Sequence, residues 1–154
     1  MEQFINPLLD IIQEVYIGTD AKESWVIDAD PGNGFTRTIK SLTAEQASTP
    51  AVPGGSTVAA HTGHLKWSLD FAMQFYEGKQ PKGEWAESWL TKTVDEQEWE
   101  KLQQDLLASY NKVKEAVAAV KDWSNPYFVK GTLALLPHAA YHLGAIKQLI
   151  IFTK

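Results

Sequence analysis

The four histidines of this chain fall into two pairs, and no histidine stands elsewhere in the sequence. His61 and His64 are three residues apart, and His138 and His142 are four residues apart. At these spacings the side chains of one helix share a face, with Cβ atoms about 5–6 Å apart. Two such imidazoles can converge on one metal ion, because a Zn–N bond is about 2.0–2.1 Å long. The spacing indicates a metal site between two helices; the alternative is that the histidines are core residues with satisfied ring nitrogens.

Other kinds of catalytic site are not visible around these pairs. The residue after His138 is Ala139, so the H-E-x-x-H pattern of zinc proteases is absent. From Gly131 to Lys154 there is no Asp or Glu, and Asp70, six residues after His64, points to another face. No pair of carboxylates for acid–base catalysis is therefore expected on these helices.

Four further residues, two beside the histidine pairs and two on the first helix, have two interpretations each. Ser68 and Tyr141 share helix faces with histidines and either line the site or serve packing alone. Asp10 and Glu14, four residues apart, either orient an imidazole or form a solvated face. We favour the solvated face, because charged residues lie mostly outside.

Apolar residues at helical spacing predict four main helices that must position the histidines. The first runs from Phe4 to Val15 and ends at Gly18. The second has Ser56 as its N-cap and runs to about Glu77. The third opens with a capping box over residues 93–96, and the fourth extends from near Lys130 to the C-terminus. Pro137 should kink this last helix, unless regular helix begins only at about Leu136.

The connections between these helices are long. Residues 30–34 carry strong turn chemistry, residues 35–42 suit a short helix, and residues 43–46 suit a capping box. Residues 78–92 form a loop or short helix in which Trp85 and Trp89 could roof a pocket. No segment alternates like a strand. We therefore expect an all-α four-helix bundle with long crossover connections, formed as a single domain by residues 1–154.

Composition excludes several classes of function. The 154 residues include no cysteine, so disulfides, thiolate metal sites and cysteine nucleophiles are excluded. The charge of −5 and the single arginine, Arg37, argue against a nucleic-acid partner. The apolar stretch over residues 133–152 is interrupted by polar residues, so no membrane span is expected. The first residues lack the basic pattern of an export signal, which places the protein in the cytoplasm as an expectation.

Two segments resemble the DinB-like superfamily of metal-dependent four-helix bundles. The first is Gly54 to Trp67, GGSTVAAHTGHLKW, and the second is His138 to Gln148, HAAYHLGAIKQ. The family pattern places a histidine early in the second helix, before an apolar residue and an aromatic one. The last helix of the family carries H-x-x-x-H-x-G. His64 matches the first element, and His138, His142 and Gly144 match the second.

The resemblance implies a site in which His64, His138 and His142 hold a divalent metal, zinc or nickel with zinc favoured. It leaves His61 open as a fourth ligand, as a neighbour of a ligand or as a residue without a role. The resemblance also implies homodimers. Characterised members of the family that the chain resembles are thiol transferases and isomerases. Gly144 is expected to let a neighbouring helix approach closely.

Two functions are therefore expected from the sequence. The first is a metal-dependent transferase or hydrolase that acts on a small-molecule thiol or an electrophilic substrate, with no catalytic side chain assigned. In this function the metal would acidify a water molecule or a thiol. The alternative is a non-catalytic helical dimer with a structural or vestigial metal site.

Overall fold

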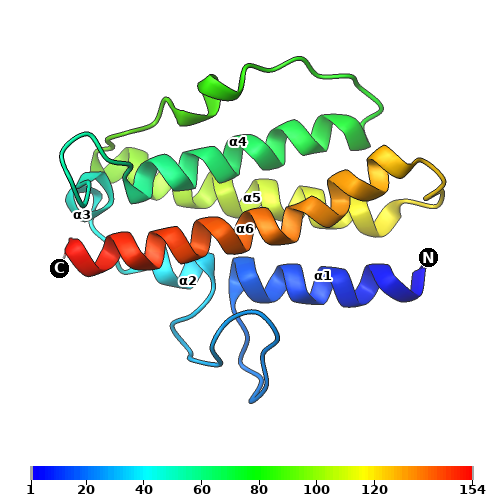
Figure 1. Ribbon diagram of the computed structural model, residues 1–154, viewed down its shortest axis with the longest axis horizontal. Helices are drawn as coiled ribbons and strands as arrows, with labels where there is room; N and C mark the ends of the chain where they lie inside the picture. The colour runs from blue at the N-terminus through cyan, green and yellow to red at the C-terminus, as the bar shows by residue number, and fades with distance from the viewer. Residues whose placement is uncertain (1, 154) are drawn as a thin grey trace.

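Helices are the only regular secondary structure in residues 2–153, the part of the chain that the computed structural model describes. Four are long: α1 (Glu2–Ile17), α4 (Val58–Tyr76), α5 (Glu96–Ala119) and α6 (Pro126–Phe152). Two α-helices and one 3₁₀ helix are short: α2 (Phe35–Lys40), α3 (Ala44–Ser48) and η1 (Trp85–Trp89). The expected all-α four-helix bundle is confirmed (Figure 1).

The four long helices form a bundle in which α4 lies between α5 and α6, and α1 contacts α5 and α6. Helices α4 and α5 run in the same direction, whereas α6 runs antiparallel to α4 (Figure 1). A long crossover must therefore join α4 to α5, and residues 78–94, here named the strap, provide it. The antiparallel arrangement brings the middle of α6 to the first half of α4.

Glycines and capping residues set the helix ends. Gly18, with φ of 95°, follows α1, and Gly78, with φ of 75°, follows the C-cap of α4. Both occupy the left-handed region that glycine adopts at low cost. The capping box predicted at Thr43 and Gln46 is present at the start of α3.

Two predicted caps are wrong by one or two residues. Helix α4 is capped by Thr57 rather than Ser56, because the Thr57 hydroxyl accepts the N–H of Ala60. Helix α5 is capped by Asp95, whose carboxylate accepts the N–H of Glu98 while the Glu98 side chain accepts the N–H of Asp95. This reciprocal pair replaces the box expected over residues 93–96, because Thr93 lies in the extended segment before the helix.

Helix α6 begins earlier than predicted and continues through its internal proline. Asn125 caps it by accepting the N–H of Tyr127, so the expected start near Lys130 is wrong, as is the alternative start near Leu136. Pro137 has no N–H to donate to the carbonyl of Leu133. Both residues are exposed, so water can satisfy that carbonyl.

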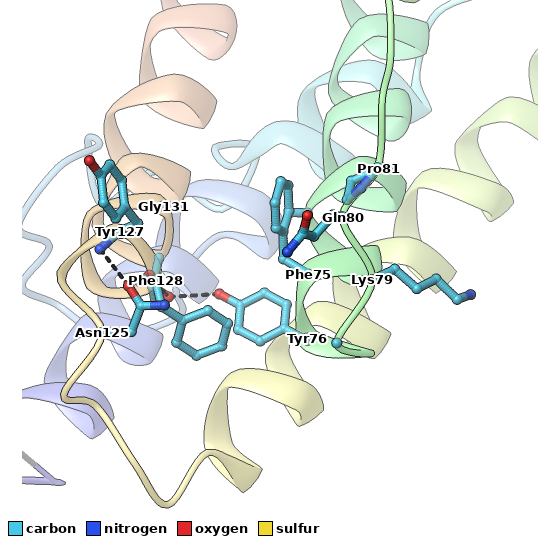
Figure 2. Close-up of a pocket in the computed structure, with 12 residues that line it drawn as sticks. Phe75, Tyr76, Lys79, Gln80, Pro81, Asn125, Tyr127, Phe128 and Gly131 are labelled. Atoms are coloured by element: carbon cyan, nitrogen blue, oxygen red, sulfur yellow. Dashed lines mark hydrogen bonds between the residues drawn. The ribbon is translucent and has the colours of Figure 1, made fainter.

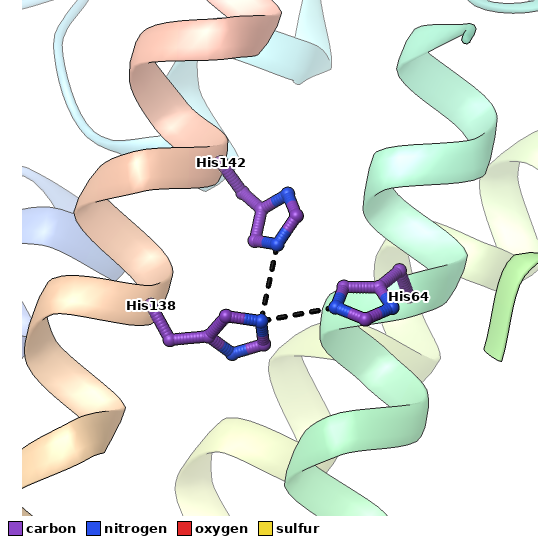
Figure 3. A group of neighbouring side chains, drawn as sticks. All are labelled: His64, His138 and His142. Carbon is purple, nitrogen blue, oxygen red and sulfur yellow. Dashed lines mark hydrogen bonds between the residues drawn. The ribbon is translucent and has the colours of Figure 1, made fainter. Parts of the chain in front are cut away.

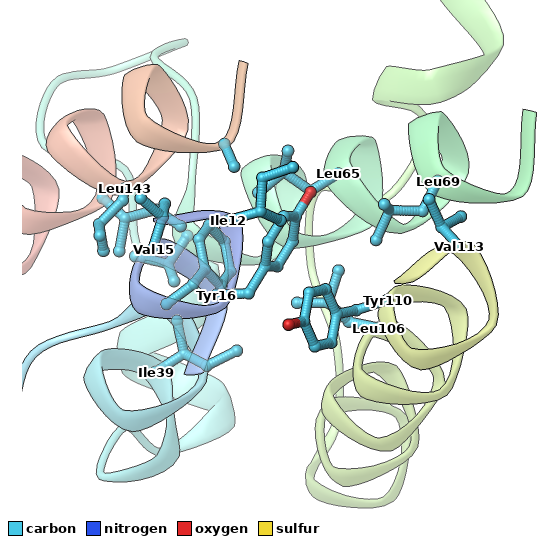
Figure 4. Packing of buried hydrophobic residues seen from close by; sticks show 14 of the residues in the cluster. Ile12, Val15, Tyr16, Ile39, Leu65, Leu69, Leu106, Tyr110, Val113 and Leu143 are labelled. Atoms are coloured by element: carbon cyan, nitrogen blue, oxygen red, sulfur yellow. The ribbon is translucent and has the colours of Figure 1, made fainter. Parts of the chain in front are cut away.

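The core lies where α1, α4, α5 and α6 meet (Figure 4). Tyr16 and Tyr110 stack there with ring centroids 4.8 Å apart. Leu65 and Leu69 enter the core from α4, and Leu143 enters it from α6. These apolar side chains fix the rotation of α4 and α6, and so decide which other residues face each other.

Glu14 differs from the expectation of a solvated face. Its side chain is buried, and its carboxylate accepts the backbone N–H groups of Trp25, Val26 and Ile27 at 2.7–3.0 Å. Burial raises the pKa of this carboxyl, but the three N–H groups together outweigh it, and the net pKa is lowered. Asp10 is exposed, as expected. Glu14 thus anchors the connection between α1 and α2 and does not orient an imidazole.

Helices that are both long and apolar enough to cross a membrane are absent among residues 2–153.

Candidate metal centre

The two histidine pairs meet between α4 and α6. The Nε2 atom of His138 lies 2.9 Å from Nε2 of His64 and 3.1 Å from Nε2 of His142. Figure 3 shows the three rings converging from the two helices. Their ligand atoms all lie within 4.8 Å of one another. The structure therefore brings together the three histidines that the resemblance singled out.

Burial of the cluster follows from the helix faces that form the core. On α4, His64 precedes the core residue Leu65 and is fully buried. On α6, His142 precedes the core residue Leu143 and is 2% exposed. His138, one turn earlier, is half-buried and lies at the outer side of the cluster. The site is thus reached from solvent most directly past His138.

Ser88 of the strap determines where His64 carries its proton. The Ser88 hydroxyl donates to the carbonyl of Trp85 at 2.6 Å, so its oxygen accepts from Nδ1 of His64 at 2.8 Å. A neutral imidazole has one N–H. With that proton on Nδ1, the Nε2 lone pair of His64 faces the other two histidines. Sequence reasoning missed Ser88, because no helical spacing relates it to a residue 24 positions away.

His61 contacts the cluster from behind His142. Its Nδ1 lies 2.7 Å from Nδ1 of His142, on the opposite side of that ring from Nε2. When His142 donates this hydrogen bond, its own Nε2 is left unprotonated and faces His138. Of the three roles left open for His61, this geometry matches the neighbour of a ligand. Such contacts orient ligating histidines in metalloproteins.

The strap covers the cluster with two tryptophans. Trp89 stacks on His64 with ring centroids 4.2 Å apart and an interplanar angle of 16°. Trp85 meets the same imidazole edge-on at 4.9 Å. The strap reaches this close because α4 has a glycine at position 63, where a Cβ would lie 2.9 Å from Cβ of Thr91. The two tryptophans of the long connection thus contact His64, and neither lines any of the cavities found among the described residues.

Burial keeps the four imidazoles neutral at ordinary pH. Burial makes the largest contribution to the lowering of the pKa of each histidine below its ordinary value of 6.5. Together with the rings of His138 and His61, burial lowers the pKa of His64 to about 4. Burial and the three neighbouring imidazoles lower the pKa of His142 to about 3. Neutral imidazole is the form that binds a metal.

Ser68 and Tyr141 lie beside the cluster in different ways. The Ser68 hydroxyl donates to the backbone carbonyl of His64 at 2.8 Å, so it faces its own helix rather than the rings. The Tyr141 ring stands edge-on to His142 at 5.0 Å and is 70% exposed. Tyr141 therefore lies at the border of the site with its side chain largely in solvent.

Two other sequence interpretations concern residues outside the cluster. Asp70 pairs with Lys66 at 2.7 Å and accepts from the Ser109 hydroxyl at 2.5 Å, so it is directed away from the histidines as expected. Gly144 was expected to allow a close helix contact. A Cβ at this position would meet no described atom within 4 Å, so the expectation is wrong for the described residues of this chain.

The DinB superfamily model matches residues 33–146, which include all four histidines and the whole strap. The chain belongs to the DinB superfamily. Comparison with curated proteins gave no match, and comparison with solved structures gave none either. The family assignment therefore rests on the family model, and the function is argued from the site.

The donor set of this superfamily member suits a divalent cation. Ligand nitrogens of a tetrahedral zinc site lie about 3.3 Å apart, given Zn–N bonds of about 2.0–2.1 Å. The shorter Nε2–Nε2 distances of the cluster, 2.9 and 3.1 Å, are near that value. An Nε2 proton on His138 can point at only one of its two neighbours. A cation would satisfy all three lone pairs.

Proposed function

We propose that the protein is a metal-dependent transferase or hydrolase in which His64, His138 and His142 hold a divalent cation through Nε2. The observation that carries the proposal is the convergence of the three Nε2 atoms between α4 and α6. The hydrogen bond from His64 to Ser88 supports it, because that bond leaves the metal-facing nitrogen free of its proton.

A cation bound by three neutral imidazoles keeps its full charge and supplies Lewis acidity to a water molecule or thiol. The chain's own residues support that chemistry in other ways. His61 orients the ring of His142, and Ser88 orients that of His64. Trp89 excludes water from the buried side of His64. Because the chain has no cysteine, a thiol at the site must belong to a substrate.

Zinc is the metal we propose, with nickel as the alternative. Imidazole suits both ions, and three protein ligands leave coordination positions for water or substrate. The described cluster contains no carboxylate, which argues against magnesium or calcium, since both prefer oxygen ligands.

The test is metal analysis followed by an activity screen. The protein is purified without a histidine tag, and zinc and nickel are measured per chain by mass spectrometry. We expect one ion per chain in the wild type and none in His64→Ala/His138→Ala. The loaded protein is then assayed with small thiols and a panel of electrophiles and esters. Failure to bind stoichiometric metal would overturn the metal site; one bound ion with no turnover would favour the alternative below.

The alternative function is a non-catalytic homodimer, and one surface favours it. Helix α6 exposes Leu133, Tyr141 and Phe152 along the side that faces away from the core. Gly144 lies on the same side with open space beyond it, and Lys147 is the only charged residue between positions 131 and 153. Apolar faces of this kind are typical of protein interfaces. Sedimentation of the wild type and of Tyr141→Lys, each with and without chelator, tests this alternative function. A wild type that is a dimer and shows no activity in the assays above, together with a monomeric Tyr141→Lys, would support the non-catalytic homodimer.

A further inference from the structure

A cavity of about 690 Å³ lies between α4 and α6, as the histidine cluster does, but nearer the C-terminal end of α4. Its walls come from the last turn of α4, the start of the strap and the first turns of α6 (Figure 2). No histidine lines it. Its volume lies within the range of about 300–1,000 Å³ that is usual for small-molecule sites.

The cavity and the histidine cluster lie along the same helix faces. On α6, Gly131 lines the cavity and precedes His138 by seven residues, which is two helical turns or about 10.5 Å along the helix axis. On α4, Phe75 lines the cavity eleven residues after His64, which is three helical turns or about 16.5 Å along the axis. Ser68 and the larger Phe71 lie between them on α4. An elongated molecule seated in the cavity and directed along these faces would pass Ser68 and Phe71 before it reached the histidines.

Aromatic rings form the walls of the cavity. Phe75 stands on the α4 side, and Tyr127 and Phe128 stand on the α6 side (Figure 2). Phe128 meets Tyr76 edge-on, with ring centroids 4.8 Å apart. Phe75 is 46% exposed and Tyr127 is 82% exposed, although both are large aromatic residues. Walls of this kind bind flat apolar groups by stacking and by burial of apolar surface.

Two polar groups give the cavity a direction. The Thr132 hydroxyl donates to the carbonyl of Phe128, so Tyr76 donates its hydroxyl proton to Thr132 at 2.7 Å. The Tyr76 oxygen is left able to accept a hydrogen bond from a ligand. Among the described residues, Lys79 is the only charged one that lines the cavity; its ammonium pairs with Glu77 at 2.6 Å and extends away from the aromatic walls (Figure 2). An anionic group at the rim of the cavity would compete with Glu77 for this ammonium.

We propose that this cavity binds the flat apolar body of a substrate that carries an anionic group, and that the reactive end of the same molecule extends to the histidines. The proposal rests on the proposed function and names its substrate class. It commits to a small molecule because the cavity is concave, of ligand size, and charged at one point only.

The test compares two glycines of α6. A Cβ at Gly131 or at Gly144 would meet no described atom within 4 Å, so either position accepts a larger side chain. Gly131 lines the cavity, whereas Gly144 does not. The variants Gly131→Leu and Gly144→Leu are titrated with anilinonaphthalene sulfonate, a flat aromatic probe with one anionic group. Phenylnaphthylamine, which has the same body without the sulfonate, is the matched neutral probe.

We expect Gly131→Leu to weaken binding of both probes roughly tenfold and Gly144→Leu to leave it unchanged. Lys79→Met should weaken binding of the anionic probe about threefold and leave the neutral probe unaffected, since an exposed charge contributes modestly. In NMR spectra of the wild type, the probes should shift the backbone amide signals of residues 78–80 and 131–132. Equal binding by the two glycine variants, or shifts confined to other residues, would overturn the proposal. Loss of a dimer in Gly131→Leu would also overturn it, because the cavity would then be an interface.

The variant His64→Ala/His138→Ala separates this proposal from the function on which it rests. If it binds no metal but binds both probes like the wild type, the cavity exists independently of the metal site. If the wild type binds no metal yet the glycine comparison succeeds, the metal site fails and the cavity stands. Loss of probe binding in the histidine variant would contradict a separate cavity.

Discussion

The Nδ1 atom of His61 lies 2.7 Å from the Nδ1 atom of His142. This contact joins the two histidine pairs on the side of the His142 ring that faces away from the point where the three Nε2 atoms converge. This contact assigns His61 a different position from the other three histidines. It holds a ring that faces the proposed metal instead of facing the metal itself. Its loss should therefore weaken metal binding without abolishing it.

The first prediction concerns this positioning role of His61. His61→Phe should lower metal affinity about 10–100-fold, the usual effect of removing a partner of a ligating histidine. His61→Asn should restore part of the affinity, because its amide oxygen can accept the hydrogen bond from Nδ1 of His142. A chelator-competition titration measures both. Loss of all binding in His61→Asn, as for His64→Ala, would instead indicate a direct ligand.

The second prediction compares two serines near His64. Ser88→Ala removes the acceptor of the Nδ1 proton and should lower metal affinity about tenfold. Ser68→Ala is the matched control, because its hydroxyl contacts only the His64 carbonyl. The same competition titration is used. An equal effect of the two substitutions would show that Ser88 does not act through the imidazole.

The third prediction concerns the dependence of stability on pH in chelator-treated protein. The pKa of His64 is about 4 and that of His142 about 3 in the folded state, both below the ordinary 6.5. At pH values between the folded-state pKa and 6.5, the unfolded chain binds more protons than the folded chain. The free energy of unfolding should therefore fall as the pH decreases from 7 to 5. The loss should reach at most a few kcal/mol, at about 1.4 kcal/mol per unit of pKa difference.

Urea unfolding at pH 7 and pH 5 measures that loss. The double variant His64→Gln/His142→Gln is the control, since it keeps the carboxylates and lacks the two depressed groups. Its midpoint should change less between the two pH values. A wild-type midpoint that does not depend on pH would contradict the lowered pKa values.

The fourth prediction concerns Glu14. Glu14→Gln should destabilise the fold by about 1–3 kcal/mol, because the charged acceptor of three partly buried hydrogen bonds from backbone N–H groups is replaced by a weaker one. Asp10→Asn, one turn away and exposed, should change stability by less than about 0.5 kcal/mol. Urea unfolding at pH 7 compares them. If both variants match the wild type, the carboxylate does not anchor the connection.

The fifth prediction concerns the strap. Trp89→Ala should speed chelator-driven release of metal about tenfold, because the stacked ring shields His64 from solvent. Trp25→Ala, whose side chain is 83% exposed on the first connection, serves as control. Stopped-flow mixing with excess chelator measures the release rate. Identical rates in both variants would show that the strap does not limit access.

Helices and histidine pairs could be predicted from the sequence because both depend on residues a few positions apart. The apolar stripes and Gly18 gave the long elements, and the spacing of His138 and His142 gave a shared face. The N-caps of α4 and α5 were missed by one or two residues. Neighbouring Ser, Thr and Asp side chains compete for the same role there, and geometry selects among them.

Contacts between distant residues were not predictable in the same way. Ser88 lies on an irregular segment, and nothing in its neighbourhood marks it as a partner of His64. Glu14 was assigned to a solvated face because its own helix gives no reason to bury it. The N–H groups that stabilise its carboxylate belong to residues 25–27, which have no regular structure. Gly63 lets the strap pass close to α4, but a glycine inside a helix does not by itself show which segment of the chain will pack against it.

The histidine cluster joins positions that are far apart along the chain. His64 and His138 are separated by 74 residues, whereas Glu14 and its partners are separated by 11–13. The connection anchored by Glu14 can form as soon as α1 exists, but the cluster completes only when α6 docks onto α4. Contacts absent from the folding transition state act mainly on the unfolding rate. If the cluster forms after the folding transition state, a cation bound there would lengthen the lifetime of the folded bundle and leave the speed of folding nearly unchanged.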